Sequence, residues 1–129
     1  MIRATPSGAL LAASLVLTIA GCVPASGPDP EACEEPAVSI ELELTADGLS
    51  PDAPSVCRDQ DVTFVVTSEL DGVLHVHGYD SEVPAFTVAD GETREITFTA
   101  GRSGQFPVEF HAEDDPRGEG VAVFTVHEP

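Results

Sequence analysis

Histidines are the side chains whose type and spacing best suit chemistry in this sequence, and that chemistry is metal binding. His75 and His77 are separated by one residue, so on a regular strand they point to the same face of the sheet. His111 is a third candidate ligand, and imidazoles suit Cu(II), Zn(II) or Ni(II). Carboxylates could complete a hard, open site, and the candidates for that role are Glu109, Glu113, Asp114 and Asp115.

The same residues also allow an interpretation without a metal. A His-x-His pair arises too where each imidazole is hydrogen-bonded and structural, and His127, near the C-terminus, is expected in solvent. Tyr79 is the only tyrosine, and we expect it to pack with its hydroxyl at the rim of the domain. The acidic run Glu113–Asp115 is typical of a solvated loop. Calcium binding is the alternative for that run, although it lacks the spacing of an EF-hand.

Strands must position these side chains, because apolar residues alternate with polar ones along most of the chain. The residues of Val38–Leu44 are apolar at every second position, which indicates one buried and one solvated face. Glycine-containing turns separate the segments, and no helical period is sustained after the first 22 residues. These features predict an all-β sandwich. The other alternating segments are Val62–Val66, Ile96–Phe98, Phe106–Phe110 and Val121–Val126.

The N-terminus predicts export and lipid anchoring. Arg3 precedes an uncharged apolar run that ends in Ile-Ala-Gly-Cys22, which is typical of a secretory signal and resembles a bacterial lipobox. We therefore expect a lipoprotein signal peptide over 1–21, a lipidated Cys22 with a proline-rich tether over 22–36, and the sandwich over 37–129. The alternatives are an ordinary cleaved signal and an uncleaved membrane helix, for which the run is short. The predicted location is extracytoplasmic, anchored to the bacterial cell membrane through lipid.

The remaining cysteines and the charge fit that location. With Cys22 lipidated, Cys33 and Cys57 are left as a pair outside the reducing cytosol, so we predict a structural disulfide between them. The chain has 23 acidic residues, no lysine and a formal net charge of −18. Such a charge repels nucleic acid and attracts cations or basic partners. Its simpler role is to keep an exported protein soluble.

Three segments, taken in order, resemble a cupredoxin domain. The first is Val38–Leu44 followed by Asp61–Val66, the second is Val73–Asp80, and the third is Gly104–His111. The second resembles the strand that supplies the first copper histidine, and the third resembles the Gly-x-Tyr/Phe-x-x-x-Cys strand before the copper loop. The resemblance runs from Ala37 to the C-terminus and implies a Greek-key sandwich.

The resemblance also indicates which ligands of a blue-copper site this sequence lacks. By position, His75 matches the family's first ligand, but Phe110 occupies the place of the copper cysteine. No His-x-x-x-x-Met loop follows, and the only methionine is the initiator. Without a thiolate, the blue-copper centre and its electron transfer do not carry over. His111 follows the lost cysteine position, and we expect it to approach His75 and His77 at the rim of the sandwich.

Two functions remain from these residues. One is a lipid-anchored, cupredoxin-like domain that binds copper or zinc through His75, His77 and His111. The other is a metal-free sandwich that binds a partner or supports an envelope complex or transporter. Catalysis has no motif to support it, neither a Gly-x-Ser-x-Gly elbow nor a free cysteine nucleophile, so we expect no enzyme.

Overall fold

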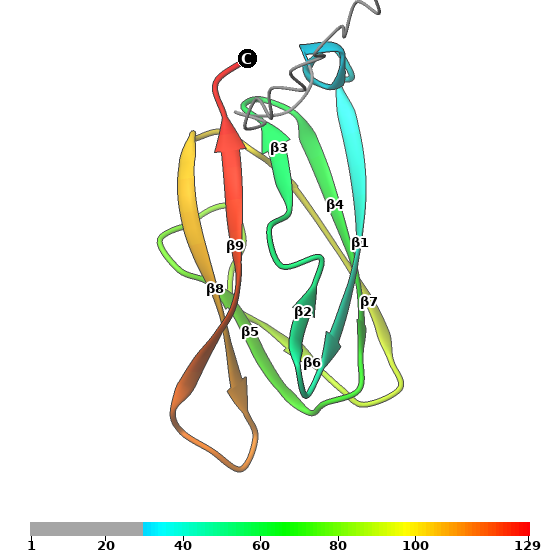
Figure 1. Ribbon diagram of the computed structural model, residues 1–129, viewed down its shortest axis with the longest axis vertical. Helices are drawn as coiled ribbons and strands as arrows, with labels where there is room; N and C mark the ends of the chain where they lie inside the picture. Colours follow the sequence, from blue (N-terminus) through cyan, green and yellow to red (C-terminus); the bar gives the residue numbers. More distant parts are fainter. Residues whose placement is uncertain (1–29) are drawn as a thin grey trace, which may run out of the picture.

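Residues 30–129 are the part of the chain that this computed structural model describes, and alternating side chains build nine strands within it. The strands form two sheets that face each other, which Figure 1 shows as separate layers. The predicted all-β sandwich is confirmed. In spatial order the first sheet contains β2 (Gly48–Ser50), β1 (Ala37–Thr45), β4 (Asp61–Ser68) and β7 (Thr93–Thr99), and the second contains β3 (Ser55–Cys57), β9 (Gly118–His127), β8 (Gly104–Ala112), β5 (Gly72–Val76) and β6 (Phe86–Val88).

The chain crosses between the sheets, and this crossing sets the pairing order. β1 pairs in parallel with β4 over the whole length from Ala37–Asp61 to Leu44–Ser68. Parallel neighbours need a long connection, and here β2, β3 and their loops supply it. Strand β3 also leaves the first sheet and pairs with β9 in the second. Each predicted alternating segment lies inside one of these strands. The two-residue alternation did not show which strands pair with one another.

An aromatic cluster fills the space between the sheets. Phe124 of β9 is fully buried, and its ring centre lies 5.2 Å from that of Phe64 and 5.9 Å from that of Phe98. Tyr79 and Phe106 complete the cluster, at 5.8 and 6.4 Å from Phe124. Edge-to-face contacts of this kind add to the free energy gained from burying the rings. The inward side chains of both sheets therefore meet in one core.

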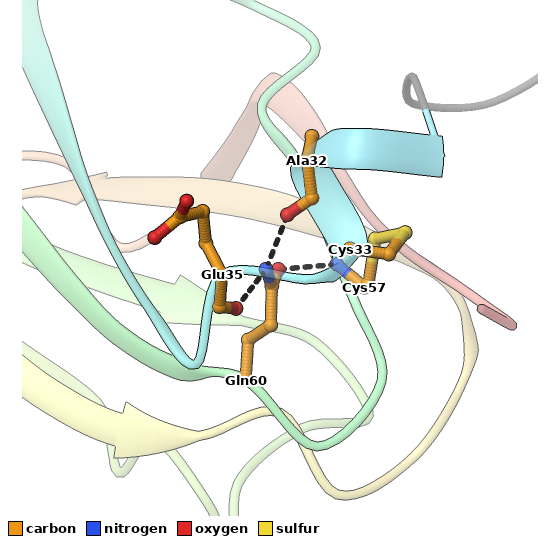
Figure 2. Close-up of a disulfide and its surroundings, with 5 residues drawn as sticks. All are labelled: Ala32, Cys33, Glu35, Cys57 and Gln60. Atoms are coloured by element: carbon orange, nitrogen blue, oxygen red, sulfur yellow. Dashed lines mark hydrogen bonds between the residues drawn. A yellow bond between two sulfur atoms is a disulfide. The ribbon is translucent and has the colours of Figure 1, made fainter.

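A disulfide fastens the start of the described chain to this core. Cys33 ends the short 3₁₀ helix η1 (Pro30–Cys33) and is bonded to Cys57 at the end of β3, as predicted. Beside it, the buried Gln60 side chain accepts a hydrogen bond from the Cys57 amide and donates to the carbonyls of Ala32 and Glu35 (Figure 2). The segment before β1 is thereby held at two points.

The predicted signal peptide over 1–21, Cys22 and the tether up to residue 29 lie outside the described residues. Among residues 30–129, no helix is long and apolar enough to cross a membrane. This segment contains both sheets, their shared core and the disulfide. It therefore has the components of an independently folding unit.

Candidate metal site

Strand alternation places the candidate ligands on the outer face of the second sheet. On β5, Leu74 and Val76 are buried in the core, so His75 between them faces outward. His77 follows the end of β5, and its amide still donates a 2.8 Å hydrogen bond to the carbonyl of Pro107. The pairing with β8 therefore extends to His77, which is exposed.

The neighbouring strand brings a carboxylate to the same place. Glu109 lies directly opposite His75 in the antiparallel register of β5 and β8, between the buried side chains of Val108 and Phe110. One ligand atom from each of His75, His77 and Glu109 lies within 4.8 Å of the other two. The two imidazole rings are 5.5 Å apart, centre to centre. Two strands thus present two imidazoles and one carboxylate at a single point.

His111 lies next to this group and contacts its carboxylate. Its Nε2 is 3.5 Å from Oε2 of Glu109, and its ring centre is 6.5 Å from that of His75. The ring lies over Gly118 of β9, where a Cβ would come within 2.6 Å of the His111 Cε1 atom. Of the three predicted histidines, the structure brings His75 and His77 together and places His111 beside Glu109.

The position of the cluster differs from the rim that we expected. His75 is the last residue but one of β5 and lies opposite Glu109, inside β8. The reason is the period of two, which points His75 and His111 away from the core and so onto the flat outer face. Glu109 was one of four candidate carboxylates that the sequence did not rank, and its spacing of two residues from His111 is the signal that could have distinguished it.

Asp80 is a member of the site that sequence reasoning missed. Its Oδ1 forms a hydrogen bond with Nε2 of His75, and this bond holds the pKa of the Asp80 carboxyl below its usual value. The carboxyl is mostly exposed, whereas the side chain of His75 is 22% exposed. An acidic residue five positions after a histidine carries no distinctive pattern, because a loop conformation decides whether the two meet.

Comparison with known proteins supports the architecture alone. No protein-family model matches the sequence, and no curated protein matches it. Solved structures do match: a copper-binding protein in its apo form has 12% identity and a TM-score of 0.56, covering 72% of this chain and 90% of that one. Auracyanin A, a blue copper protein of Chloroflexus aurantiacus, has 14% identity and a TM-score of 0.53, covering 70% and 99%. The metal-binding domain of the Cu(I)-exporting ATPase CopA of Streptococcus pneumoniae has 16% identity and a TM-score of 0.51, covering 72% and 88%.

The chain has a cupredoxin-like fold. The resemblance recognised in its sequence is therefore confirmed at the level of architecture, including the two-sheet sandwich. At identities this low, what the matched proteins bind does not transfer to this chain.

In this cupredoxin-like domain, the position aligned with the copper cysteine belongs to the core. Phe110 is 7% exposed and lies opposite Leu74, which is also buried. Both cysteines of residues 30–129 are joined in the disulfide, so the described part of the chain contains no free thiol. The ligands that the domain does present are the imidazoles and carboxylates on its outer face.

The acidic run of the β8–β9 loop lies apart from the histidine cluster. Glu113, Asp114 and Asp115 line an open groove at the end of the sandwich, together with Glu69 and Asp71 from the loop between β4 and β5. Arg117 is the basic residue in that lining. Because none of these carboxylates belongs to the group around His75, Glu109 is the one predicted carboxylate that joins it.

Proposed function

We propose that this domain binds one divalent transition-metal ion, copper or zinc, on the outer face of its second sheet. The observation that carries the proposal is the convergence of His75, His77 and Glu109, whose ligand atoms lie within 4.8 Å of one another. Two histidines and a glutamate form a donor set that proteins use for zinc, and imidazole also suits Cu(II). Glu109 thereby adds an oxygen donor to the two imidazole donors predicted at His75 and His77.

Small side-chain rotations would close the site around an ion. Metal–nitrogen distances of about 2.0–2.1 Å in a tetrahedral site place neighbouring ligand atoms roughly 3.3 Å apart. The present separations of up to 4.8 Å are therefore somewhat too wide. His77 is exposed and Glu109 is partly exposed, so both can rotate inward without disturbing the core. Three protein ligands would leave at least one position for water or for a ligand from another molecule.

The charge of the whole chain favours cation capture. A formal net charge of −18 raises the local concentration of cations near the surface. His111, at 3.5 Å from Glu109, is placed to orient that carboxylate or to join the metal's ligands once Glu109 moves. Its role as a ligand stays a prediction.

The proposed site is of a non-blue kind and lies outside the cytoplasm. The described domain offers no thiolate to a metal, and a blue-copper site needs one, so holding or relaying an ion is the role that we propose in place of electron transfer. The lipobox that ends at Cys22 supports a lipid anchor, and the disulfide between Cys33 and Cys57 is typical of an oxidising compartment.

Metal titration of the segment 30–129 tests the proposal. We expect one Cu(II) or Zn(II) ion per molecule by calorimetry, with NMR shifts at His75 and His77. His75→Ala or His77→Ala should abolish this stoichiometric binding and leave the fold intact. His127→Ala is the matched control, because that histidine lies at the end of β9 beside Cys57 and outside the cluster.

Two results would contradict the metal site. One is tight binding that persists after both histidines of the pair are replaced, and the other is weak binding at many sites that follows bulk acidity. The first result would place the metal at other residues, whereas the second would favour the second candidate function, a metal-free accessory module for a basic partner in the cell envelope. The acidic groove formed by Glu69, Asp71 and the β8–β9 loop is the observation that supports this second function.

A further inference from the structure

We propose that Asp80 is a positioning residue of the metal site: it holds His75 with its proton on Nε2 and leaves Nδ1 as the atom that binds the metal. This inference rests on the proposed metal-binding function. It specifies which ring nitrogen of His75 carries the proton and names Asp80 as the residue that selects this tautomer.

The tautomer follows from the chemistry of the two partners. Nε2 of His75 and Oδ1 of Asp80 are joined by a hydrogen bond. An ionised carboxylate can only accept hydrogen bonds, so the neutral imidazole must carry its proton on Nε2 and keep its lone pair on Nδ1. Histidines that bind metals commonly donate their other ring N–H to a carboxylate in this way. The pair of Asp80 and His75 therefore supplies the carboxylate and the histidine of a carboxylate–histidine–metal triad.

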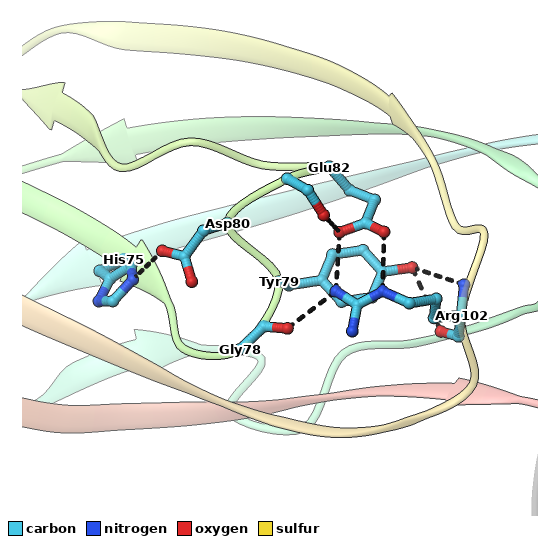
Figure 3. A network of polar contacts seen from close by, with 7 residues as sticks. His75, Gly78, Tyr79, Asp80, Glu82 and Arg102 are labelled. Atoms are coloured by element: carbon cyan, nitrogen blue, oxygen red, sulfur yellow. Dashed lines mark hydrogen bonds and ion pairs between the residues drawn. The ribbon is translucent and has the colours of Figure 1, made fainter.

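The loop that carries Asp80 is held from both sides, which makes the contact a fixed one. Tyr79 is fully buried, and its hydroxyl is hydrogen-bonded to the backbone of Arg102. The guanidinium of Arg102 donates two 2.8 Å hydrogen bonds to the carboxylate of Glu82 and one to the carbonyl of Gly78. Figure 3 shows this network on one side of the loop and Asp80 reaching His75 on the other. The residues before and after Asp80 are thus anchored independently of it.

Folding stability gives little reason for the contact. The side chain of Asp80 is 61% exposed, and exposed ion pairs contribute little to folding because solvent screens them. The loop remains anchored through Tyr79, Arg102 and Glu82 whether or not Asp80 bonds to His75. The specific consequence of the contact is therefore the orientation and tautomer of the imidazole.

Nitrogen-15 NMR of His75 in metal-free 30–129 tests the tautomer directly. We expect the proton on Nε2 in the wild type and a mixture of both tautomers in Asp80→Asn, because an amide can either donate or accept. Asp47→Asn removes the same charge from the exposed turn between β1 and β2 and should leave His75 unchanged. A wild-type imidazole protonated on Nδ1 would overturn the proposal.

Zinc titration of the same three proteins tests the consequence. Asp80→Asn should weaken binding by about 10- to 100-fold at unchanged stoichiometry and thermal stability, and Asp47→Asn should match the wild type. In the zinc-loaded wild type, the Nε2 proton of His75 should persist while Nδ1 shifts. Zinc affinity of Asp80→Asn within twofold of the wild type, or zinc bound at Nε2, would overturn the inference. Absence of binding by the wild type would instead overturn the proposed function, and the metal-free NMR experiment would still decide the role of Asp80.

Discussion

Gly72 is the first residue of β5, the strand that carries His75, and its surroundings leave no room for a side chain. A Cβ at this position would lie 2.3 Å from the carbonyl oxygen of His111 and 2.6 Å from the ring of Phe110. The first of these atoms belongs to the backbone of the neighbouring strand and cannot rotate away. Gly120 on β9 is different, because a Cβ there would meet no atom within 4 Å. Close packing of β5 against β8 thus requires a glycine at position 72, whereas position 120 on β9 has room for a side chain.

Substituting these two glycines tests the packing at the residue scale. We expect Gly72→Ala to lower the free energy of unfolding by about 1–3 kcal/mol, the usual effect of overpacking. Gly120→Ala should leave it unchanged or raise it by roughly 0.5 kcal/mol, because alanine loses less conformational freedom in a strand than glycine does. Urea denaturation of both variants measures the difference. Equal stabilities would show that β5 does not lie this close to β8.

The loop between β5 and β6 brings Asp80 to His75 of the candidate metal site, and Arg102 is the residue that holds this loop. Its guanidinium stacks 4.8 Å from the centre of the Tyr79 ring while it binds Glu82. The hydrogen bonds from Arg102 lower the pKa of the Glu82 carboxyl to about 2. Burial raises the pKa of the Tyr79 hydroxyl. The loop is therefore held by a charged pair and by a buried aromatic ring.

The low pKa of Glu82 predicts how this loop responds to acid. A carboxyl whose pKa is depressed in the folded state stabilises the fold above its unfolded pKa and loses this effect as the pH falls through the folded value. The ion pair of Glu82 with Arg102, which we call the clamp, should therefore stabilise the domain fully above about pH 4.5 and lose its effect toward pH 2. We expect Glu82→Gln to be less stable than the wild type at pH 6 and equally stable near pH 2. Urea denaturation at both pH values measures this.

A matched charge loss separates the clamp from general electrostatics. Glu95→Gln removes one exposed carboxylate from β7 in the other sheet, so it reports what loss of a negative charge does without touching Arg102. A pH-dependent stability difference of the same size in Glu95→Gln would contradict the role of the clamp.

At the scale of the whole molecule, the disulfide and the acidic groove lie at opposite ends of the sandwich. Closing a loop with a separation of 24 residues stabilises the fold by about 3 kcal/mol in the chain-entropy model. Figure 1 shows η1 and the C-terminus at one end of the sandwich and the β8–β9 loop at the other. A lipid on Cys22 would attach the domain through the η1 end, which lies opposite the acidic groove.

Lipid anchoring is tested on the full chain in a bacterial host. We expect the wild-type protein in the membrane fraction, with a mass that shows acyl chains on Cys22. Cys22→Ala should remove the acyl chains and prevent the stable anchoring that two or more chains provide. Processed wild-type protein without acyl chains on Cys22 would support an ordinary cleaved signal instead.

Some contacts in the candidate site could be predicted from the local sequence pattern, and others depend on the tertiary structure. Alternation predicted that His75 and His77 share a face, and the structure confirms that both lie on the outer side of the second sheet. The partners of His75 could not be read in the same way. Glu109 reaches it through the register of β5 with β8, and Asp80 reaches it through the conformation of a loop.

The amino-acid sequence by itself determined the alternating segments within β1, β4, β7, β8 and β9, the pairing of Cys33 with Cys57, and the absence of a cysteine at position 110, where the resemblance to cupredoxins implies a copper ligand. The alternating segments depend on a period of two, which a stretch of chain carries locally, and the cysteine pairing depends on how many cysteines remain in an exported domain. Tertiary structure decided the strand order, the place of the candidate metal site on the outer face and the carboxylates that lie beside its histidines. Such features require residues distant in the chain to meet, and only the packing of the two sheets around their aromatic core sets which ones do.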